Sequence, residues 1–203
     1  IFNTVLLKDI VERKRISDVK LLEDVIRFLF DNIGNIVSTK KIADTLNSNG
    51  RRTTSGTIDN YIRALKDAFI LYEANRYDIK GKEFLKSLEK YYIVDIGLGE
   101  RTRNIGHTLE NIVYLELLRR GYQVSIGKLD LLEVDFIAQK EDKRIYYQVS
   151  ASVLDEKTYE REFAPLKKIN DSYPKYVLTL DEFPMGEDGI EQKNIIDFLL
   201  EEN

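Results

Sequence analysis

The sequence predicts an α+β chain of two domains, a helical domain over residues 1–90 and a mixed α/β domain over residues 91–203. Apolar residues recur at helical spacing up to residue 68, whereas β-prone segments follow residue 121. Residues 1–90 hold 17 Lys and Arg against 13 Asp and Glu, a net of +4, and the remainder holds 14 against 22, a net of −8. This asymmetry predicts that the two domains have different partners. The alternative is that the surface charge has drifted and that the asymmetry has no functional meaning.

The composition excludes several kinds of site. The chain has no Cys, which rules out disulfides and thiolate metal sites, and its single histidine, His107, argues against a His-rich zinc site. No apolar run approaches the roughly 20 residues that span a bilayer, and no signal peptide is visible. We therefore expect a soluble, cytoplasmic protein without a membrane partner. The chain begins at Ile1 inside an expected helix, so we expect a fragment of a longer protein.

The first domain is expected to hold three short amphipathic helices after an N-terminal helical segment, and then two strands. Gly34 ends one helix, Ser38 is a good N-cap for the next, and Thr54 or Ser55 caps the last. The expected helices cover residues 2–19, 20–33, 39–46 and 55–68, and the strands cover residues 69–74 and 77–79 around the turn Asn75-Arg76. Three short helices followed by a hairpin is the order of a winged helix.

In a winged helix the third helix is the recognition helix. The candidate DNA-binding residues lie on the outward face of that helix, just ahead of it, or at the tip of the wing; they are Arg51, Arg52, Thr57, Asn60, Arg63, Lys66 and Arg76. Their side chains suit phosphate contacts, and Asn60 or Arg63 has the length to reach base edges. The alternative is a winged helix that serves as a packing module, because a net charge of +4 is small for a nucleic-acid-binding domain.

The second domain follows a helix, three strands, a helix and a strand, and closes on a further helix. Gly121 suits the C′ position after the first of these helices. The expected helices cover residues 109–120, 158–169 and 195–200, and the strands cover residues 122–126, 131–138, 145–150 and 175–180. This order is that of the common core of the restriction-endonuclease-like fold.

Three polar residues interrupt apolar segments of the second domain: Glu110 in a helix, and Asp135 and Gln148 in two strands. A buried carboxylate is costly unless it has a partner or a metal. Glu110 and Asp135 are therefore candidate ligands for Mg²⁺, which prefers hard oxygen ligands. A magnesium ion held there would lower the pKa of a bound water and stabilise a charged transition state.

These residues resemble the metal site of the PD-(D/E)XK nuclease superfamily, which has a helix Glu, a strand Asp, and then Glu or Gln, any residue, and Lys. Glu110, Asp135 and Gln148 match the first three positions, but Ser150 occupies the lysine position. The resemblance implies that this lysine positions water or stabilises the transition state, and its loss costs orders of magnitude in rate. Lys128, on the preceding hairpin, is the candidate to take its place. We expect a metal-free relic in which Gln148 bridges Glu110 and Asp135. The alternative is a Mg²⁺-dependent DNA nuclease that uses all three.

A wider resemblance covers nearly the whole chain, through the stretches at residues 3–10, 91–98, 109–114, 133–136 and 147–150. These stretches resemble the C-terminal region of prokaryotic AAA+-type ATPases that carry an uncharacterised domain after the nucleotide-binding module. The resemblance implies an ATP-binding domain before Ile1, and the chain itself holds no phosphate loop. We therefore expect no cofactor in this fragment beyond the candidate Mg²⁺.

The resemblance implies an accessory region that binds DNA or a protein partner and couples it to the upstream ATPase domain of the same chain. One alternative is the nuclease. The other is an interaction or oligomerisation module, with a second copy of the chain as its partner.

Overall fold

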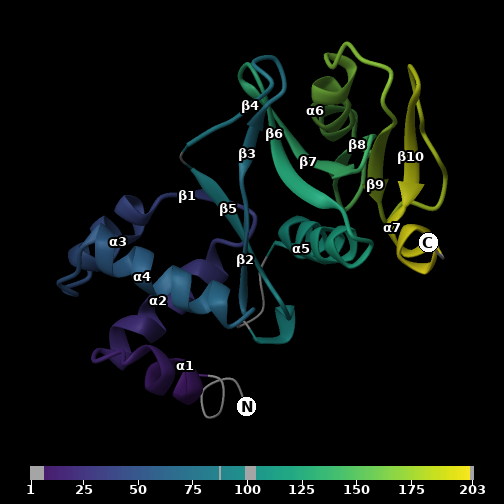
Figure 1. Cartoon of the computed structure of the whole chain (residues 1–203). Helices are drawn as coiled ribbons and strands as arrows, with labels where there is room; N and C mark the ends of the chain where they lie inside the picture. Colours follow the sequence, from purple (N-terminus) through teal and green to yellow (C-terminus); the bar gives the residue numbers. More distant parts are fainter. Residues whose placement is uncertain (1–6, 87, 99–103, 202–203) are drawn as a thin grey trace. The chain divides into compact units, whose positions relative to one another are not determined.

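The computed structural model describes residues 7–86, 88–98 and 104–201. Two compact units divide the chain: one combines Ile1–Glu73 with Leu88–Arg103, and the other combines Ala74–Ser87 with Asn104–Asn203 (Figure 1). The expected boundary between residues 90 and 91 therefore needs correction. Residues 74–87 belong to the second unit because the strands within them pair with its sheet, whereas residues 91–103 belong to the first.

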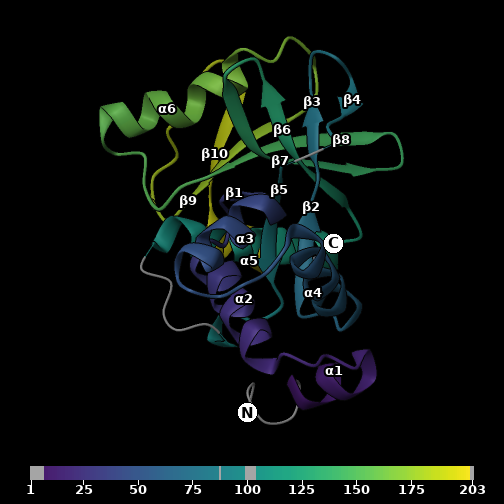
Figure 2. The same ribbon diagram turned by 90° about the vertical axis from the view of Figure 1, so that its left-hand side faces the viewer.

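Local capping sets the helices of the first unit, which are α1 (Leu7–Lys14), α2 (Val19–Asp31), α3 (Thr39–Ser48) and α4 (Ser55–Asp67) (Figure 2). The side chains of Asp18, Ser38 and Thr54 each accept a hydrogen bond from the backbone N–H three residues later. This confirms the last two helices. The helix expected over residues 2–19 ends earlier, at Lys14, because Arg15 has a φ of 51°. Residues 2–6 of that expected helix, and residues 3–6 of the first stretch of the wider resemblance, lie outside the described part.

The first unit also holds a three-stranded sheet with the order β1-β5-β2. Its strands are β1 (Ile36–Val37), β2 (Leu71–Ala74) and β5 (Glu89–Ile93), and β1 runs antiparallel to β5. A short 3₁₀ helix, η2 (Ile96–Leu98), follows β5. The hairpin expected over residues 69–79 is wrong, because β2 pairs in this sheet and the next strand pairs in the other unit. A single residue, Asn75, separates the two strands, which is too little for a two-residue hairpin turn.

The second unit is built on a seven-stranded sheet with the order β10-β9-β8-β7-β6-β3-β4. β6, β7 and β8 form an antiparallel meander, whereas β9 and β10 continue the sheet in parallel on one side and β3 pairs in parallel with β6 on the other. The strands are β3 (Arg76–Asp78), β4 (Glu83–Phe84), β6 (Gln123–Leu129), β7 (Leu132–Lys140), β8 (Lys143–Val149), β9 (Lys175–Thr179) and β10 (Ile190–Asn194). Neither β4 nor β10 was expected from the sequence.

Helices cover both faces of this sheet: α5 (Ile105–Arg119) and α7 (Ile195–Leu200) lie on one face and α6 (Glu156–Lys167) on the other (Figure 1). Successive strand residues point to opposite faces. Accordingly, Tyr147 of β8 packs on Phe198 of α7, and its neighbour Gln148 contacts Glu162 of α6. A hydrophobic core cluster between the sheet and α6 includes Tyr146, Phe163, Val177 and Ile190. The order of helix, three strands, helix and strand is confirmed.

Candidate functional site

The outward face of α4 borders a hollow of about 430 Å³ in the first unit. Thr57, Asn60 and Arg63, which the sequence predicted as DNA-contacting residues, line it together with Lys14 and Arg15 from the end of α1. The left-handed φ of Arg15 turns the chain between α1 and α2, and this turn brings Lys14 and Arg15 to α4. The sequence analysis assigned neither residue to the site.

Most of the predicted cations in the first unit already have a carboxylate partner. Arg51 pairs with Asp24 at 2.8 Å, Arg63 pairs with Asp59 at 3.1 Å, and Lys66 pairs with Glu73. The hollow shows the same pattern, since Lys14 pairs with Asp67 at 2.6 Å and holds the pKa of that carboxyl below its usual value.

Two of the predicted DNA-binding residues stand apart from the others. Arg52 is exposed and makes no ion pair within the described part of the chain. Arg76 does not lie at a wing tip, as expected, but is half-buried on β3 in the sheet of the second unit. The structure therefore brings together only part of the predicted set, namely Thr57, Asn60 and Arg63, and adds Lys14 and Arg15 to it.

The polar residues of the second unit meet where the ladder between β7 and β8 ends. The last paired residues are Phe136 and Tyr147, so Asp135 and Gln148 lie just beyond the ladder. The backbone N–H of Asp135 donates to Oε1 of Gln148 at 2.7 Å, and the N–H of Val149 donates to Oδ2 of Asp135 at 2.9 Å. Side chains thus satisfy two buried backbone donors that the ladder leaves open.

Gln148 extends this network to a residue that the sequence analysis missed. Its Nε2 donates to Oε2 of Glu162 at 2.9 Å, and the other carboxylate oxygen of Glu162 accepts from Arg161 at 2.6 and 2.9 Å. Glu162 is buried on α6. The sequence did hold a signal, because Glu162 stands three residues after Tyr159 and four before Leu166, on the apolar face of the helix.

The other candidates for the nuclease-like site have different surroundings. Glu110 is buried on α5, across the sheet from Glu162, so the expected bridge from Gln148 to Glu110 is corrected to one between Asp135 and Glu162. The hydroxyl of Ser150 donates to the carbonyl of Ser152 at 3.1 Å, and its N–H donates to the carbonyl of Leu178. Lys128 lies on β6, opposite Glu133.

The magnesium site that the resemblance implies stays a prediction. Oδ2 of Asp135 and Oε1 of Gln148 each accept a hydrogen bond from a backbone N–H group. Among residues 7–86, 88–98 and 104–201, the structure holds no group of three His, Cys, Asp or Glu side chains that could bind a metal ion. The network is thus a set of paired polar groups, which commonly have a structural role in a protein core.

A family described as a domain of unknown function (DUF8612) matches residues 1–108. The chain belongs to this family. An uncharacterized protein of Haemophilus influenzae is 44% identical over 207 residues, and the match covers 99% of this chain and 51% of that protein. An uncharacterized protein of Methanocaldococcus jannaschii is 30% identical over 176 residues, covering 80% of this chain and 39% of that protein.

The chain therefore spans about half the length or less of these curated relatives. No solved structure matches it significantly. Within the described residues, no helix has both the length and the apolar character needed to cross a lipid bilayer.

Replacing Asp135 with Ala is expected to lower the free energy of unfolding by about 1–3 kcal/mol, because the buried N–H of Val149 loses its acceptor. Asp135→Asn keeps an oxygen in the same place and should retain more than half of that stability. Urea unfolding of both variants measures the difference. An equal decrease in the free energy of unfolding in the two variants would contradict this explanation. It would mean that Asp135 stabilises the fold through its charge and not through its hydrogen bond.

Proposed function

We propose that the chain is an accessory region that binds nucleic acid through α4 and couples it to an ATPase domain elsewhere in the same protein. The observation that carries the proposal is the hollow beside α4, where Lys14, Arg15, Thr57, Asn60 and Arg63 lie together. Cations and polar side chains on one helix face, beside a concave surface, suit the backbone and base edges of a duplex.

The element order of the first unit supports a winged-helix interpretation. In this unit α2 is followed by the short strand β1, by the helices α3 and α4, and by two further strands, β2 and β5. The strands form a sheet with the order β1-β5-β2. α4 is therefore the third helix of the core. In such a domain the third helix enters the major groove. Asn60 has the donor and acceptor pair that suits adenine, and Arg63 has the paired donors that suit guanine. Lys14 and Arg15 would contact phosphates.

The ion pairs around α4 limit the expected affinity. Asp59 and Asp67 lie beside Arg63 and Lys14, so only a small excess of positive charge faces the hollow. We expect about three phosphate contacts, which correspond to a slope of about −3 in log K against log salt concentration. Binding should accordingly be weak and tolerant of sequence.

The second unit would then have a supporting, non-catalytic role as a nuclease-like domain. The order of helix, three strands, helix and strand supports that interpretation. Asp135 and Gln148 are engaged with backbone groups, and Ser150 supplies no charge where the nuclease superfamily has lysine. The ATPase part of the proposal rests on the resemblance, and the relatives leave room for it, since about half of the Haemophilus influenzae protein lies outside the match.

The test is to replace Lys14, Arg15 and Arg63 together with Ala and to measure binding to a fluorescent 20-base-pair duplex by anisotropy at several salt concentrations. We expect affinity at low salt to fall about tenfold or more and the salt slope to approach zero. The matched control replaces Lys41, Lys143 and Lys157, which are exposed, unpaired among the described residues and outside the hollow.

The control variant loses the same charge and should bind as the parent does. Equal weakening in the two triple variants would contradict a site on α4. If the chain showed no salt-dependent binding to any duplex, the proposal that it binds nucleic acid would be wrong.

A further inference from the structure

A second cavity, of about 190 Å³, lies on the α5 and α7 face of the sheet in the second unit. Aromatic and basic side chains from β8, β9, β10, α7 and the end of α5 line it; those that matter here are Arg120, Tyr122, Tyr147, Tyr176, Lys193 and Phe198. None of them belongs to the network around Gln148 or to the hollow beside α4. The cavity is therefore a separate feature.

The hydroxyl of Tyr147 is the feature that points to a ligand. Tyr147 is only 5% exposed, its ring stacks on that of Tyr176 with centroids 5.6 Å apart, and Phe198 lies 5.7 Å away on α7. Its hydroxyl has no hydrogen-bond partner within the described residues. An unpaired phenolic hydroxyl at the wall of a cavity can pair with water or with a ligand.

Tyr147 lines the cavity, and its phenol interacts electrostatically with other lining residues. Burial raises the pKa of Tyr147, and the charges that act on its hydroxyl are those of Tyr122, Tyr176, Arg120 and Glu201. All four of these residues line the cavity. The hydroxyls of Tyr122 and Tyr176 likewise have no hydrogen-bond partner in the described part of the chain. Three tyrosines with unpaired hydroxyls thus line the cavity.

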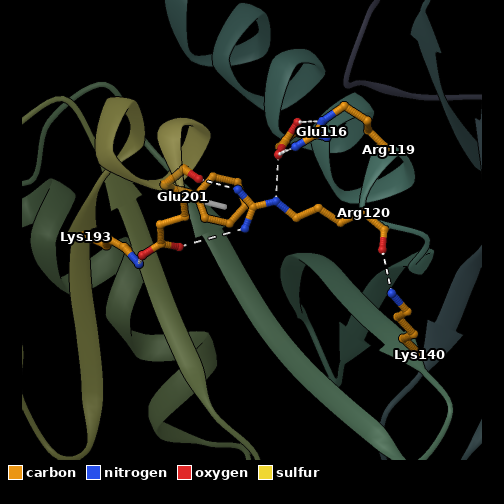
Figure 3. Close-up of polar contacts among 7 residues, drawn as sticks. Glu116, Arg119, Arg120, Lys140, Lys193 and Glu201 are labelled. Atoms are coloured by element: carbon orange, nitrogen blue, oxygen red, sulfur yellow. Dashed lines mark hydrogen bonds and ion pairs between the residues drawn. The ribbon is translucent and has the colours of Figure 1, made fainter. Parts of the chain in front are cut away.

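Arg120 supplies a cation to the wall of this cavity, and Figure 3 shows the polar contacts that hold its side chain. Its Nε donates to Oε1 of Glu116 at 2.6 Å, its Nη2 donates to the carbonyl of Phe198, and its guanidinium lies 4.2 Å from the centre of the Phe198 ring. Its Nη1 is less tightly engaged, 3.8 Å from Glu201. The guanidinium is therefore held in place, and its Nη1 can still donate a hydrogen bond to a group in the cavity.

Arg120 pairs with Glu116, which also pairs with Arg119, and Lys193 pairs with Glu201. Three cations thus stand against two carboxylates, which leaves one positive charge in excess at this wall. Phenolic, guanidinium and ammonium groups are all hydrogen-bond donors. The rings of Tyr147, Tyr176 and Phe198 supply flat apolar walls. The site therefore favours an occupant that accepts hydrogen bonds, carries negative charge and has a flat apolar part.

We propose that this cavity binds a small planar organic anion, a single aromatic ring that carries one carboxylate or one phosphate. Its volume is below the 300–1,000 Å³ that is usual for larger ligands, which restricts the occupant to about one ring and its substituent. The ring lies against Tyr147 and Phe198, and the anion accepts from the hydroxyl of Tyr147 and from Lys193. This site stands independently of the nucleic-acid surface.

The test titrates benzoate and phenyl phosphate separately into the 203-residue chain by calorimetry. We expect saturable binding of at least one, with a Kd on the order of 1 mM, as suits a ligand of about ten atoms. The better of the two identifies the anion as carboxylate or phosphate. Benzyl alcohol, which lacks the charge, and acetate, which lacks the ring, should each bind at least about tenfold more weakly. Equal binding of these controls, or no saturable binding of either probe, overturns the proposal.

Two variants locate the binding within the cavity. Tyr147→Phe removes the unpaired hydroxyl and should weaken binding about fivefold to tenfold, and Lys193→Met should weaken it by a similar factor. Tyr147→Phe should fold normally, because the hydroxyl makes no hydrogen bond within the described chain. The matched control, Tyr173→Phe, removes a hydroxyl from an exposed tyrosine outside the cavity and should change nothing. Unchanged binding in both cavity variants places the ligand elsewhere and overturns the assignment.

Discussion

Gln148→Glu is expected to lower the free energy of unfolding by about 3–5 kcal/mol at pH 7.5. The amide nitrogen of Gln148 lies 2.9 Å from a carboxylate oxygen of Glu162, and both residues are buried. The substitution replaces a hydrogen-bond donor with a second carboxylate, which repels the first across that distance.

The loss of stability in this variant should depend on pH. Two carboxylates at this distance can share one proton, which restores a hydrogen bond between them. Proton binding then favours the folded state, so the free energy of unfolding should rise as the pH falls from 7.5 towards 5.5. Urea unfolding at both pH values, by circular dichroism, measures this.

Gln148→Ala is the matched control for this pH dependence. It also removes the amide, and it should be destabilised by about 1–3 kcal/mol, because the N–H of Asp135 loses its acceptor. It introduces no carboxylate, so its loss of stability should not decrease at lower pH. If the two variants behaved alike at both pH values, Gln148 and Glu162 would not be neighbours in the folded protein.

Glu116→Ala is expected to lower the free energy of unfolding by about 2–3 kcal/mol at pH 7. Glu116 accepts hydrogen bonds from Arg119 at 2.7 and 2.8 Å and from Arg120 at 2.6 Å (Figure 3). Glu116 is 9% exposed, and the side chain of Arg120 is 10% exposed. Removal of the carboxylate leaves a largely buried guanidinium without its main acceptor. Thermal and urea unfolding measure the loss, and Asp44→Ala, at an exposed pair with Lys40, is the matched control with little expected change.

The contribution of Glu116 should also vary with pH. The hydrogen bond from Arg119, and after it the one from Arg120, holds the pKa of Glu116 below its ordinary value of 4.5. A lowered pKa in the folded state means that this stabilisation is complete above pH 4.5 and is lost as the pH falls through the folded-state pKa. The difference in unfolding free energy between the parent and Glu116→Gln should therefore shrink below pH 4.5. A difference that stayed constant to pH 3 would contradict the ion pair.

The helices were predictable because their signals are local. Ser38 and Thr54 cap the helices that follow them, and Gly121, with a φ of 81°, follows the end of α5 as expected. The strands were less predictable. β4 has two residues and β10 has the mostly polar sequence IEQKN, so neither shows the apolar alternation by which a strand is recognised.

The candidate sites were predictable as residues but not as partners. Asp135 and Gln148 were identifiable because polar groups stood in β-prone runs, yet the acceptor for Gln148 proved to be Glu162, 14 residues further along the chain. The ion pair between Arg51 and Asp24 could not be foreseen either, because it joins the segment before α4 to α2. Such contacts depend on which elements pack together, and spacing along the sequence does not specify that packing.

The sequence by itself determined the helices, their caps and the polar positions within apolar strands, since each depends on residues a few positions apart. Only the tertiary structure decided that β2 and β3, with one residue between them, belong to different sheets. It also decided that the ladder between β7 and β8 ends at Phe136 and Tyr147, and that Tyr147 lines a cavity. These features arise from pairing and packing between distant segments, where the burial of backbone donors and apolar surface outweighs local preference.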